Sequence, residues 1–328
     1  MANLLDEASI LLSATAYNNG SMLAVKPENG DGDFTFSRNS AATRVNAQGL
    51  VENVAINLPR IDYTDGCGNW LLEPQSTNLY LNSDILATQS NATNASEYTV
   101  SFYGTGNITF SGTHIGTLVG TGANNRVSAT FTATSGTLTS TISGSCTKGQ
   151  LENLNYASSY IPTNDYVTRV AETANGAGNA SNFGSEGVLF AEISALVDDG
   201  TKRSIAITDG TVNNIIVIRY NSYPPSGQKA IDALYVNNNG VPTSAAIFYS
   251  DSTDFTKIAL SYQQGALKLY VNGTLERTTP LVVNDAINWN TLQFNIGNGT
   301  QDFYGNVRQV AVYKTALTDE QLTELTTI

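Results

Sequence analysis

Aromatic, amide and carboxylate side chains gather toward the C-terminal end of this 328-residue chain, and together these residue types bind sugars. An aromatic ring packs against the C–H face of a pyranose, while amides or carboxylates bond to its hydroxyl groups. We select five candidate residues for a carbohydrate site: Trp289, Tyr304, Asp302, Tyr223 and Tyr249. Each aromatic residue among them could instead belong to a core or a subunit interface, and that alternative stays open.

The sequence offers little for catalysis. Glycoside hydrolysis needs two carboxylates about 5–10 Å apart, but no strand-like segment carries acidic residues at alternate positions. The one histidine, His114, lies in a Gly/Thr-rich hairpin where a solvent-exposed loop histidine is favoured. No nucleophile elbow, phosphate-binding loop or dinucleotide fingerprint occurs. We therefore predict that the protein is not an enzyme, with a glycan depolymerase as the alternative.

Metal and cofactor sites are also poorly supported. Two cysteines, Cys67 and Cys146, and one histidine are too few for a zinc site, and whether the cysteines pair is left open. Asp251 and Asp254 lie in the turn-like segment YSDSTDF, where turn capping is favoured over a calcium site. We predict no metal and no cofactor, with calcium as the remaining alternative.

The charge of the chain excludes several kinds of partner. Charged residues make up only 13% of the sequence, and the net charge is −12. Such an acidic protein repels nucleic-acid backbones and anionic membrane surfaces. No apolar run reaches the roughly 18 residues of a membrane-spanning helix. The first twelve residues carry Asp6 and Glu7 but no Lys or Arg, so we expect no secretory signal peptide. Release by lysis inside a particle is one way in which such a protein leaves the cell.

Short strands separated by turns account for most of the sequence. Tyr98, Val100 and Phe102 alternate with polar residues, and a hairpin turn is expected at Gly106-Asn107. Asn272-Gly273 between two β-prone runs is a strong hairpin signal. At 318–327, Thr318 and Gln321 have the spacing of a helix capping box. We predict an all-β fold of tandem antiparallel β-sandwiches of jelly-roll or lectin type, with a short C-terminal helix.

Composition divides the chain into four parts. Residues 1–84 are rich in turns and poor in apolar residues, 85–170 suit a small sandwich, 171–185 have linker composition, and 186–328 suit a second β-domain. In the first part, arginine–carboxylate pairs could replace a missing apolar core. The residues concerned are Arg38, Arg44 and Arg60 with Glu52, Asp62 and Glu73. Ordinary surface charges are an equal alternative.

Three parts of the sequence resemble known modules. DGDFTFSRNSAATRVNAQGLVENVAINLPRIDY (31–63) and LLEPQSTNL (71–79) resemble a module of phage tail and head-fibre proteins. GQLENLNYASSYIPT (149–163) resembles the end of a carbohydrate-binding-module-like sandwich found in the same proteins. The segments 257–276, 294–298 and 305–325 resemble a laminin-G or concanavalin A-like lectin domain.

These resemblances imply a structural component of a bacteriophage particle, a fibre or decoration protein of the tail or head. Residues 1–84 would anchor the chain to other virion proteins, and 186–328 would present a lectin domain for attachment to host-surface polysaccharide. Phage fibres are usually trimers, so a homotrimer is expected. The protein would be assembled in the bacterial cytoplasm, carried in the virion and released by lysis. A bacterial surface lectin is a further alternative.

Overall fold

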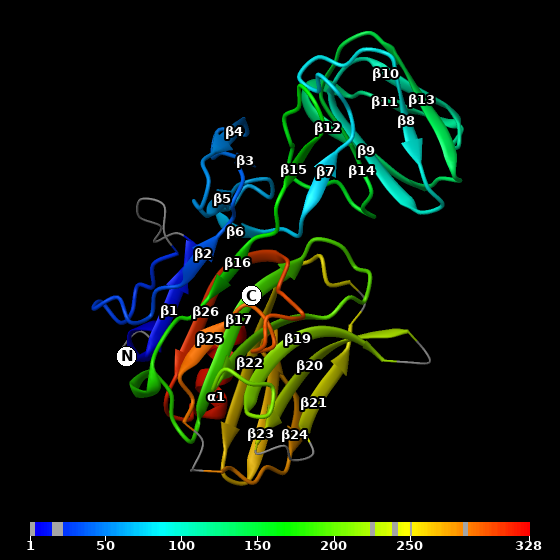
Figure 1. Cartoon of the computed structure of the whole chain (residues 1–328). Helices are drawn as coiled ribbons and strands as arrows, with labels where there is room; N and C mark the ends of the chain where they lie inside the picture. Colours follow the sequence, from blue (N-terminus) through cyan, green and yellow to red (C-terminus); the bar gives the residue numbers. More distant parts are fainter. Residues whose placement is uncertain (1–3, 15–21, 224–226, 238–241, 250, 285–287) are drawn as a thin grey trace. The chain divides into compact units, whose positions relative to one another are not determined.

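Antiparallel β-strands form nearly all of the regular structure, which confirms the predicted fold class. Figure 1 shows a computed structural model that describes residues 4–14, 22–223, 227–237, 242–249, 251–284 and 288–328. In that part of the chain there is one α-helix, α1 (Asp319–Thr326), and no helix is long and apolar enough to cross a membrane. Two compact units are present: unit 1 comprises 1–37, 68–72 and 173–328, and unit 2 comprises 38–67 and 73–172.

The two units have no boundary at the predicted positions 84 and 185, whereas unit 2 ends at Glu172, two residues after the predicted boundary at 170. In unit 1, β2 (Thr35–Ser37) pairs with β16 (Thr173–Asn175), so part of the predicted linker is a strand. Also in unit 1, β6 (Asn69–Leu72) pairs with the C-terminal strand β26 (Gly305–Tyr313). These strands find partners more than 130 residues away in the sequence, which local composition does not reveal.

Two facing sheets form the body of unit 1 (Figure 1). In the first sheet, β26 also pairs with β1 (Ile10–Ser13). The central order of that sheet is β24 (Thr274–Thr279), β23 (Ala266–Val271), β22 (Thr256–Gln263), β17 (Gly187–Ala195), β26. The second sheet has the order β21 (Thr243–Phe248), β20 (Gln228–Val236), β19 (Ile215–Tyr223), β18 (Arg203–Thr208), β25 (Thr291–Gln293).

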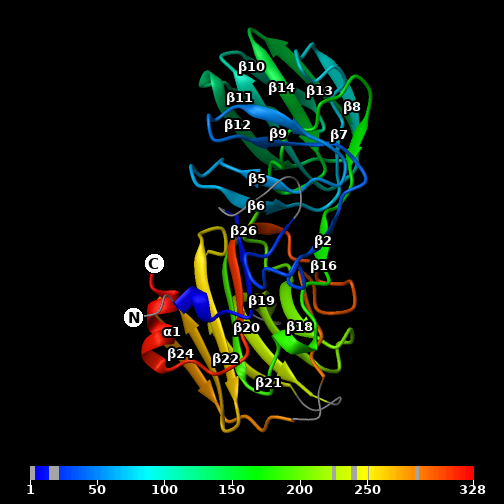
Figure 2. The same cartoon turned by 90° about the vertical axis from the view of Figure 1, so that its left-hand side faces the viewer.

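The central strands of unit 1 are apolar on both faces because both faces are covered. Toward the second sheet, the Tyr220 hydroxyl donates to the Ile193 carbonyl at 3.1 Å. On the opposite face, Phe190 lies in a buried cluster with Leu322 and Leu325 of α1. The helix α1 itself lies against β22 and β23 (Figure 2). The helix begins at the predicted capping box, since Thr318 accepts from the Gln321 amide.

The predicted hairpin at Asn272-Gly273 is confirmed between β23 and β24. Both residues have positive φ, 49° and 83°, as the tight turn that matches the twist of the two strands requires. Two short 3₁₀ helices complete the regular structure described in unit 1, η1 (Leu4–Glu7) and η3 (Ala180–Asn182).

Unit 2 contains a smaller sandwich. Its four-stranded sheet has the order β11 (Gly116–Val119), β10 (Asn107–Gly112), β13 (Gly136–Ser143), β8 (Gln89–Thr93). Its three-stranded sheet has the order β12 (Gly122–Thr132), β9 (Glu97–Gly104), β14 (Cys146–Glu152). Tyr98, Val100 and Phe102 point into the core between them, as their alternation predicts. The hairpin expected at Gly106-Asn107 is wrong, because β9 and β10 belong to different sheets.

Shorter strands surround this sandwich within unit 2. They are β3 (Ala42–Val45) paired with β4 (Val51–Val54), β5 (Arg60–Asp62), and β7 (Ser76–Asn78) paired with β15 (Val167–Arg169). Cys146 is buried in the sandwich core and Cys67 is exposed, and the two do not form a disulfide. His114 stacks on Phe131 with ring centroids 3.9 Å apart, so it packs more closely than the solvent-exposed loop histidine that we expected.

Replacing Leu138 in this core with alanine should destabilise unit 2. Leu138 is fully buried, so Leu138→Ala removes apolar contacts and leaves a cavity, with a cost of about 2–5 kcal/mol in the free energy of unfolding. Urea denaturation followed by tyrosine fluorescence measures this change. Val119→Ala is the control, because Val119 is 56% exposed. Equal effects of the two substitutions would contradict the assigned core.

Candidate functional site

One end of the unit 1 sandwich gathers most of the predicted site residues. The antiparallel register sets Ala195, the last residue of β17, opposite Gly305, the first residue of β26. It also sets Ile193 opposite Thr256, the first residue of β22. The loop that follows β17 and the loops that precede β22 and β26 therefore lie at the same end of the sheet. In the second sheet, Arg203 lies opposite Tyr220, at the same end. We call residues 196–202, 251–255 and 296–304 the loop end. Tyr249, Asp302 and Tyr304 lie in or beside it, although they are up to 55 residues apart in sequence.

Tyr304 and Asp302 form a polar–aromatic pair directly before β26. The Tyr304 hydroxyl donates to Asp302 Oδ2 at 3.3 Å, and both side chains are half-buried. Burial raises the pKa of the Asp302 carboxyl above its ordinary value, while the hydrogen bond from Tyr304 opposes this rise. A half-exposed ring beside a carboxylate is the combination that holds a sugar by its C–H face and its hydroxyl groups.

Tyr249 belongs to a row of rings that leads to this pair. Its ring meets Tyr220 edge-on at 5.6 Å, and Tyr220 lies 6.4 Å from Phe303, the residue between Asp302 and Tyr304. Tyr220 and Phe303 are buried, whereas Tyr249 is half-buried. Burial raises the pKa of Tyr249 above its ordinary value, at which the hydroxyl is already protonated and able to donate a hydrogen bond at neutral pH.

Charged residues that the sequence analysis missed line the same end. Lys229 Nζ contacts the Asp198 carboxylate, which also accepts from Ser252 Oγ at 3.0 Å. Arg203 Nη1 lies 2.9 Å from Asp199 Oδ1. The signal available in the sequence was the acidic turn Asp198-Asp199-Gly200 after an apolar strand, but such turns are common on protein surfaces.

Trp289 is placed differently from the other candidates. It is 3% exposed, and its ring meets the Tyr235 ring at 5.9 Å. The amide of the next residue, Asn290, donates to the Thr208 carbonyl at the far end of β18 from the loop end. Trp289 is therefore a core residue in this structure, the alternative left open above. Tyr223 is the last residue of β19, and its side chain lies outside the described part of the structure.

Asp251 caps a turn, as its favoured interpretation predicts. Its Oδ1 accepts from the Thr253 amide at 2.8 Å and from the Thr253 hydroxyl at 2.7 Å. These bonds lower the pKa of the Asp251 carboxyl. Among the described residues, no group of three or more His, Cys, Asp or Glu side chains is arranged to hold a metal ion.

Comparison with known families identifies the domain that carries the loop end. The family model of the concanavalin A-like lectin/glucanases superfamily matches residues 192–323. This segment is a concanavalin A-like lectin domain. The loop end lies within it, and we call residues 192–323 the lectin-like domain. A search of curated proteins finds no match to the sequence.

Solved structures share limited similarity with the chain. The CBM40 domain of the Ruminococcus gnavus IT-sialidase, bound to α2,3-sialyllactose, is 16% identical, with 44% of this chain and 83% of that chain covered and a TM-score of 0.35. Domain 4 of AbnA, a GH43 arabinanase from Geobacillus stearothermophilus in complex with arabinotriose, is 14% identical. The match covers 52% of this chain and 80% of that chain, with a TM-score of 0.37. The SAP-like pentraxin of Limulus polyphemus is 15% identical, with coverages of 42% and 68% and a TM-score of 0.34.

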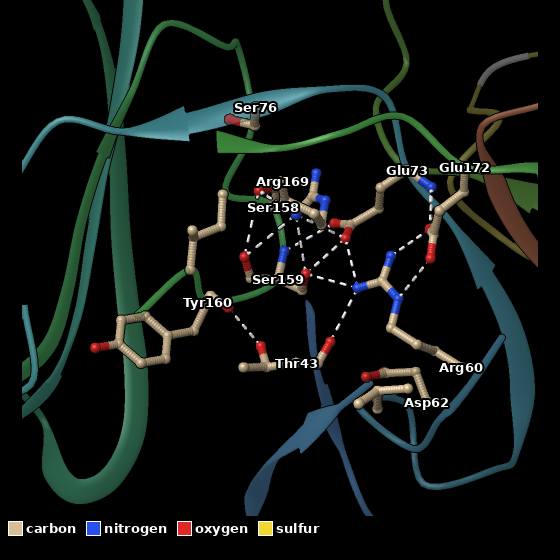
Figure 3. A network of polar contacts seen from close by, with 12 residues as sticks. Thr43, Arg60, Asp62, Glu73, Ser76, Ser158, Ser159, Tyr160, Arg169 and Glu172 are labelled. Atoms are coloured by element: carbon tan, nitrogen blue, oxygen red, sulfur yellow. Dashed lines mark hydrogen bonds and ion pairs between the residues drawn. The ribbon is translucent and has the colours of Figure 1, made fainter. Parts of the chain in front are cut away.

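Unit 2 holds a second cluster of chemically capable side chains, a buried network of arginines and glutamates (Figure 3). Arg60 Nη1 lies 2.8 Å from Glu73 Oε2, and Arg60 Nε donates to Glu172 Oε1 at 2.9 Å. Arg38 Nη1 also bonds to Glu172, at 2.6 Å, and Arg169 Nη1 lies 3.0 Å from Glu73. All five side chains are at most 2% exposed.

The predicted arginine–carboxylate pairs are confirmed in part. Arg60 pairs with Glu73, and Arg44 pairs with Glu52 at 2.6 Å. The partner of Arg38 is Glu172, which is 134 residues away and was missed. Asp62 instead accepts hydrogen bonds from two backbone amides, those of Val45 at the end of β3 and Thr64 after β5. It therefore links the ends of β3 and β5.

The charged groups of this network are held by one another in their ionised forms, as in a structural ion-pair network. Burial acts to raise the pKa of Glu73, but the charges of Arg169 and Arg60 and hydrogen bonds from Ser159 outweigh it and bring the pKa to about 2. Burial likewise acts to lower the pKa of Arg60, and Glu172 and Glu73 raise it overall. The Glu73 oxygens are occupied by Arg60, Arg169 and Ser159. Carboxylates held in this way do not transfer protons near neutral pH.

Removing one charge from this network should destabilise the protein strongly. Glu73→Gln leaves Arg60 and Arg169 without a shared counter-charge, at a cost of about 3–5 kcal/mol at neutral pH. Glu52→Gln is the matched control, because its pair with Arg44 is partly exposed and should contribute at most about 1 kcal/mol. Urea denaturation of both variants measures the difference, and similar costs would contradict the buried network.

The stabilisation by Glu73 should depend on pH in a defined direction. Its folded-state pKa of about 2 lies below the ordinary 4.5, so the contribution is complete above pH 4.5 and is lost as the pH falls toward 2. The amplitude is about 3 kcal/mol. The stability difference between the wild-type protein and Glu73→Gln should therefore shrink across this range, and a difference that stays constant would argue against a charged Glu73.

Proposed function

We propose that the protein is a structural component of a bacteriophage particle and that the loop end of its lectin-like domain binds a host-surface glycan. The observation that carries the glycan part is the half-buried Asp302–Tyr304 pair at the loop end of a domain matched to a lectin superfamily. The pair combines an apolar ring face with a carboxylate acceptor, and Tyr249 adds a second ring nearby. The arabinotriose and sialyllactose complexes named above are consistent with this proposal.

The phage part rests on the residues that carry the module resemblance. Arg38 is in the FTFSR segment, Arg60 in PRIDY, Glu73 in LLEPQ, and Ser159 in ASSYIPT. Arg60 contacts both Glu73 and Ser159, and Arg38 joins them through the shared partner Glu172. The segments that carry the resemblance therefore belong to one network, which supports the resemblance beyond composition. On this proposal the chain is a fibre or decoration protein of the tail or head, a homotrimer bound to other virion proteins.

Catalysis is not part of the proposal. Glu192 lies 3.3 Å from Arg308, and the buried Asp232 lies 2.6 Å from Arg219. Carboxylates neutralised by arginines are poorly suited to act as the acid and base of glycoside hydrolysis. A depolymerase remains the alternative, and reducing ends released from host capsule would favour it. A bacterial surface lectin is a further alternative.

Substitution at the loop end should weaken glycan binding without unfolding the protein. We expect Tyr304→Ala and Asp302→Asn each to weaken binding of the full chain to purified host polysaccharide at least tenfold, which is about 1.4 kcal/mol. Biolayer interferometry measures the affinity. Val282→Ala is the control, because Val282 is 75% exposed and follows β24 at the opposite end of the sandwich. Binding that survives both loop-end substitutions would overturn the assignment.

The particle assignment has its own test. Antibodies raised against the chain, coupled to gold, should label purified phage particles at regular positions on the head or tail in electron micrographs. Particles from a phage that lacks the coding sequence are the control. Unlabelled particles, with the protein found on bacterial cells or in the culture supernatant, would contradict the virion role and favour a bacterial lectin.

A further inference from the structure

Unit 2 carries a cationic–aromatic cluster on the three-stranded sheet, separate from the loop end. Tyr103 lies on the central strand β9, directly opposite Arg126 on β12 and Thr147 on β14. Both ladders are irregular beside this position, between Gly122 and Arg126 and between Thr147 and Gln150. Bulges redirect side chains and are common next to binding sites.

The irregularity in β14 places Lys148 over the Tyr103 ring. Lys148 has a φ of 48°, a left-handed conformation that non-glycine residues seldom adopt, and its Nζ lies 5.8 Å from the ring centroid. The Lys148 amide donates to the Asp84 carbonyl at 3.2 Å, which helps to hold the bulge. An unfavourable backbone conformation that the surrounding structure maintains points toward function.

Arg126 is held on the same face without a counter-charge. Its Nη2 donates to Ser101 Oγ at 2.8 Å, and its buried Nε has no hydrogen-bond partner among the described residues. Within that same part of the chain, no carboxylate lies within 4.0 Å of its guanidinium. The nearby Asp62 uses its oxygens on backbone amides. Every other arginine of unit 2 is paired with a glutamate, so Arg126 is free to bind an anion.

Two exposed hydroxyl side chains lie on the same face of the sheet as Arg126. Ser128 and Thr130 follow Arg126 at alternate positions of β12, so they share its face of the sheet, and both are exposed. The register sets them opposite Ser101 and Thr99. Ser101 and Thr99 are themselves buried, so the surface offers the two positive charges of Arg126 and Lys148 with the exposed hydroxyls of Ser128 and Thr130 beside them. Sugar acids present the complementary groups.

We propose that this face of unit 2 binds a carboxylate-bearing sugar. The Arg126 guanidinium pairs with the sugar carboxylate, Lys148 adds a second positive charge, and the exposed hydroxyls of Ser128 and Thr130 bond to the ring hydroxyls. Arginine suits a planar carboxylate because two of its N–H groups can bond in parallel. This inference rests on the proposed role in glycan attachment and adds a second binding site, for which sugar acids are the ligand class. The second site does not require that the loop end binds glycan.

Calorimetry on the full chain tests this site. The probes are oligosaccharides of galacturonate, glucuronate and N-acetylneuraminate, each compared with its uncharged methyl ester. We expect at least one acid to bind tenfold or more tightly than its ester, and Arg126→Gln to remove that preference. Lys148→Gly, which keeps the left-handed backbone favourable, should weaken binding of the same acid. Arg44→Gln is the matched control, because it removes one positive charge from unit 2 at a residue already paired with Glu52.

Four results would overturn the inference, the fourth being loss of acid binding in the Tyr304→Ala variant. The first is that no acid is preferred to its ester, and the second is that Arg126→Gln binds as the wild type does. The third is that inorganic sulfate binds as tightly as the sugar acid, which would show a general anion site. Tyr304→Ala separates this site from the loop end, because acid binding that depends on Arg126 should persist in that variant. Loss of acid binding in Tyr304→Ala would place the ligand at the loop end instead.

Discussion

The ion pairs that Glu73 and Glu172 make with three arginines are the interaction on which unit 2 depends. They join residues 38–60 to 73 and to 169–172, across as many as 134 residues of sequence. The apolar core occupies the inside of the sandwich, whereas the outer face of the three-stranded sheet buries polar groups such as Gln150 and Glu152. Leaving any one of these charges alone would be costly, so the whole set must form together.

Unit 1 is built on the opposite principle. Its sheets pack through apolar side chains, and α1 covers one outer face with Leu322 and Leu325. The order of its antiparallel strands then decides which connections meet at the loop end. Asp302 and Tyr304 lie half-buried in one of these connections, and loops held by a rigid scaffold are where binding residues are commonly found. Under the proposed function, glycan recognition lies in these connections, whereas stability comes from the sheets between them.

The sequence contained the local features of this fold and few of the distant ones. The turn at Asn272-Gly273 and the helix cap at Thr318 depend on neighbouring residues, and both were predicted correctly. Arg60 and Glu73 are close enough in sequence to suggest a pair, but nothing local links Arg38 to Glu172. The turn at Gly106-Asn107 resembles a hairpin, yet it crosses between sheets because tertiary packing overrides turn propensity. Composition could not separate a core Trp289 from an exposed one. Asp302 and Tyr304 were selected by residue type, and the order of the strands is what brings them beside Tyr249.

Hydrogen–deuterium exchange of the full chain, with and without purified host polysaccharide, locates glycan recognition most directly. If the loop end is the binding surface, amides in 196–202, 251–255 and 296–304 should exchange more slowly in the presence of the polysaccharide, while those around Trp289 should not change. Unchanged exchange at the loop end, under conditions where binding is saturated, would contradict the assignment of glycan recognition to this end of the lectin-like domain.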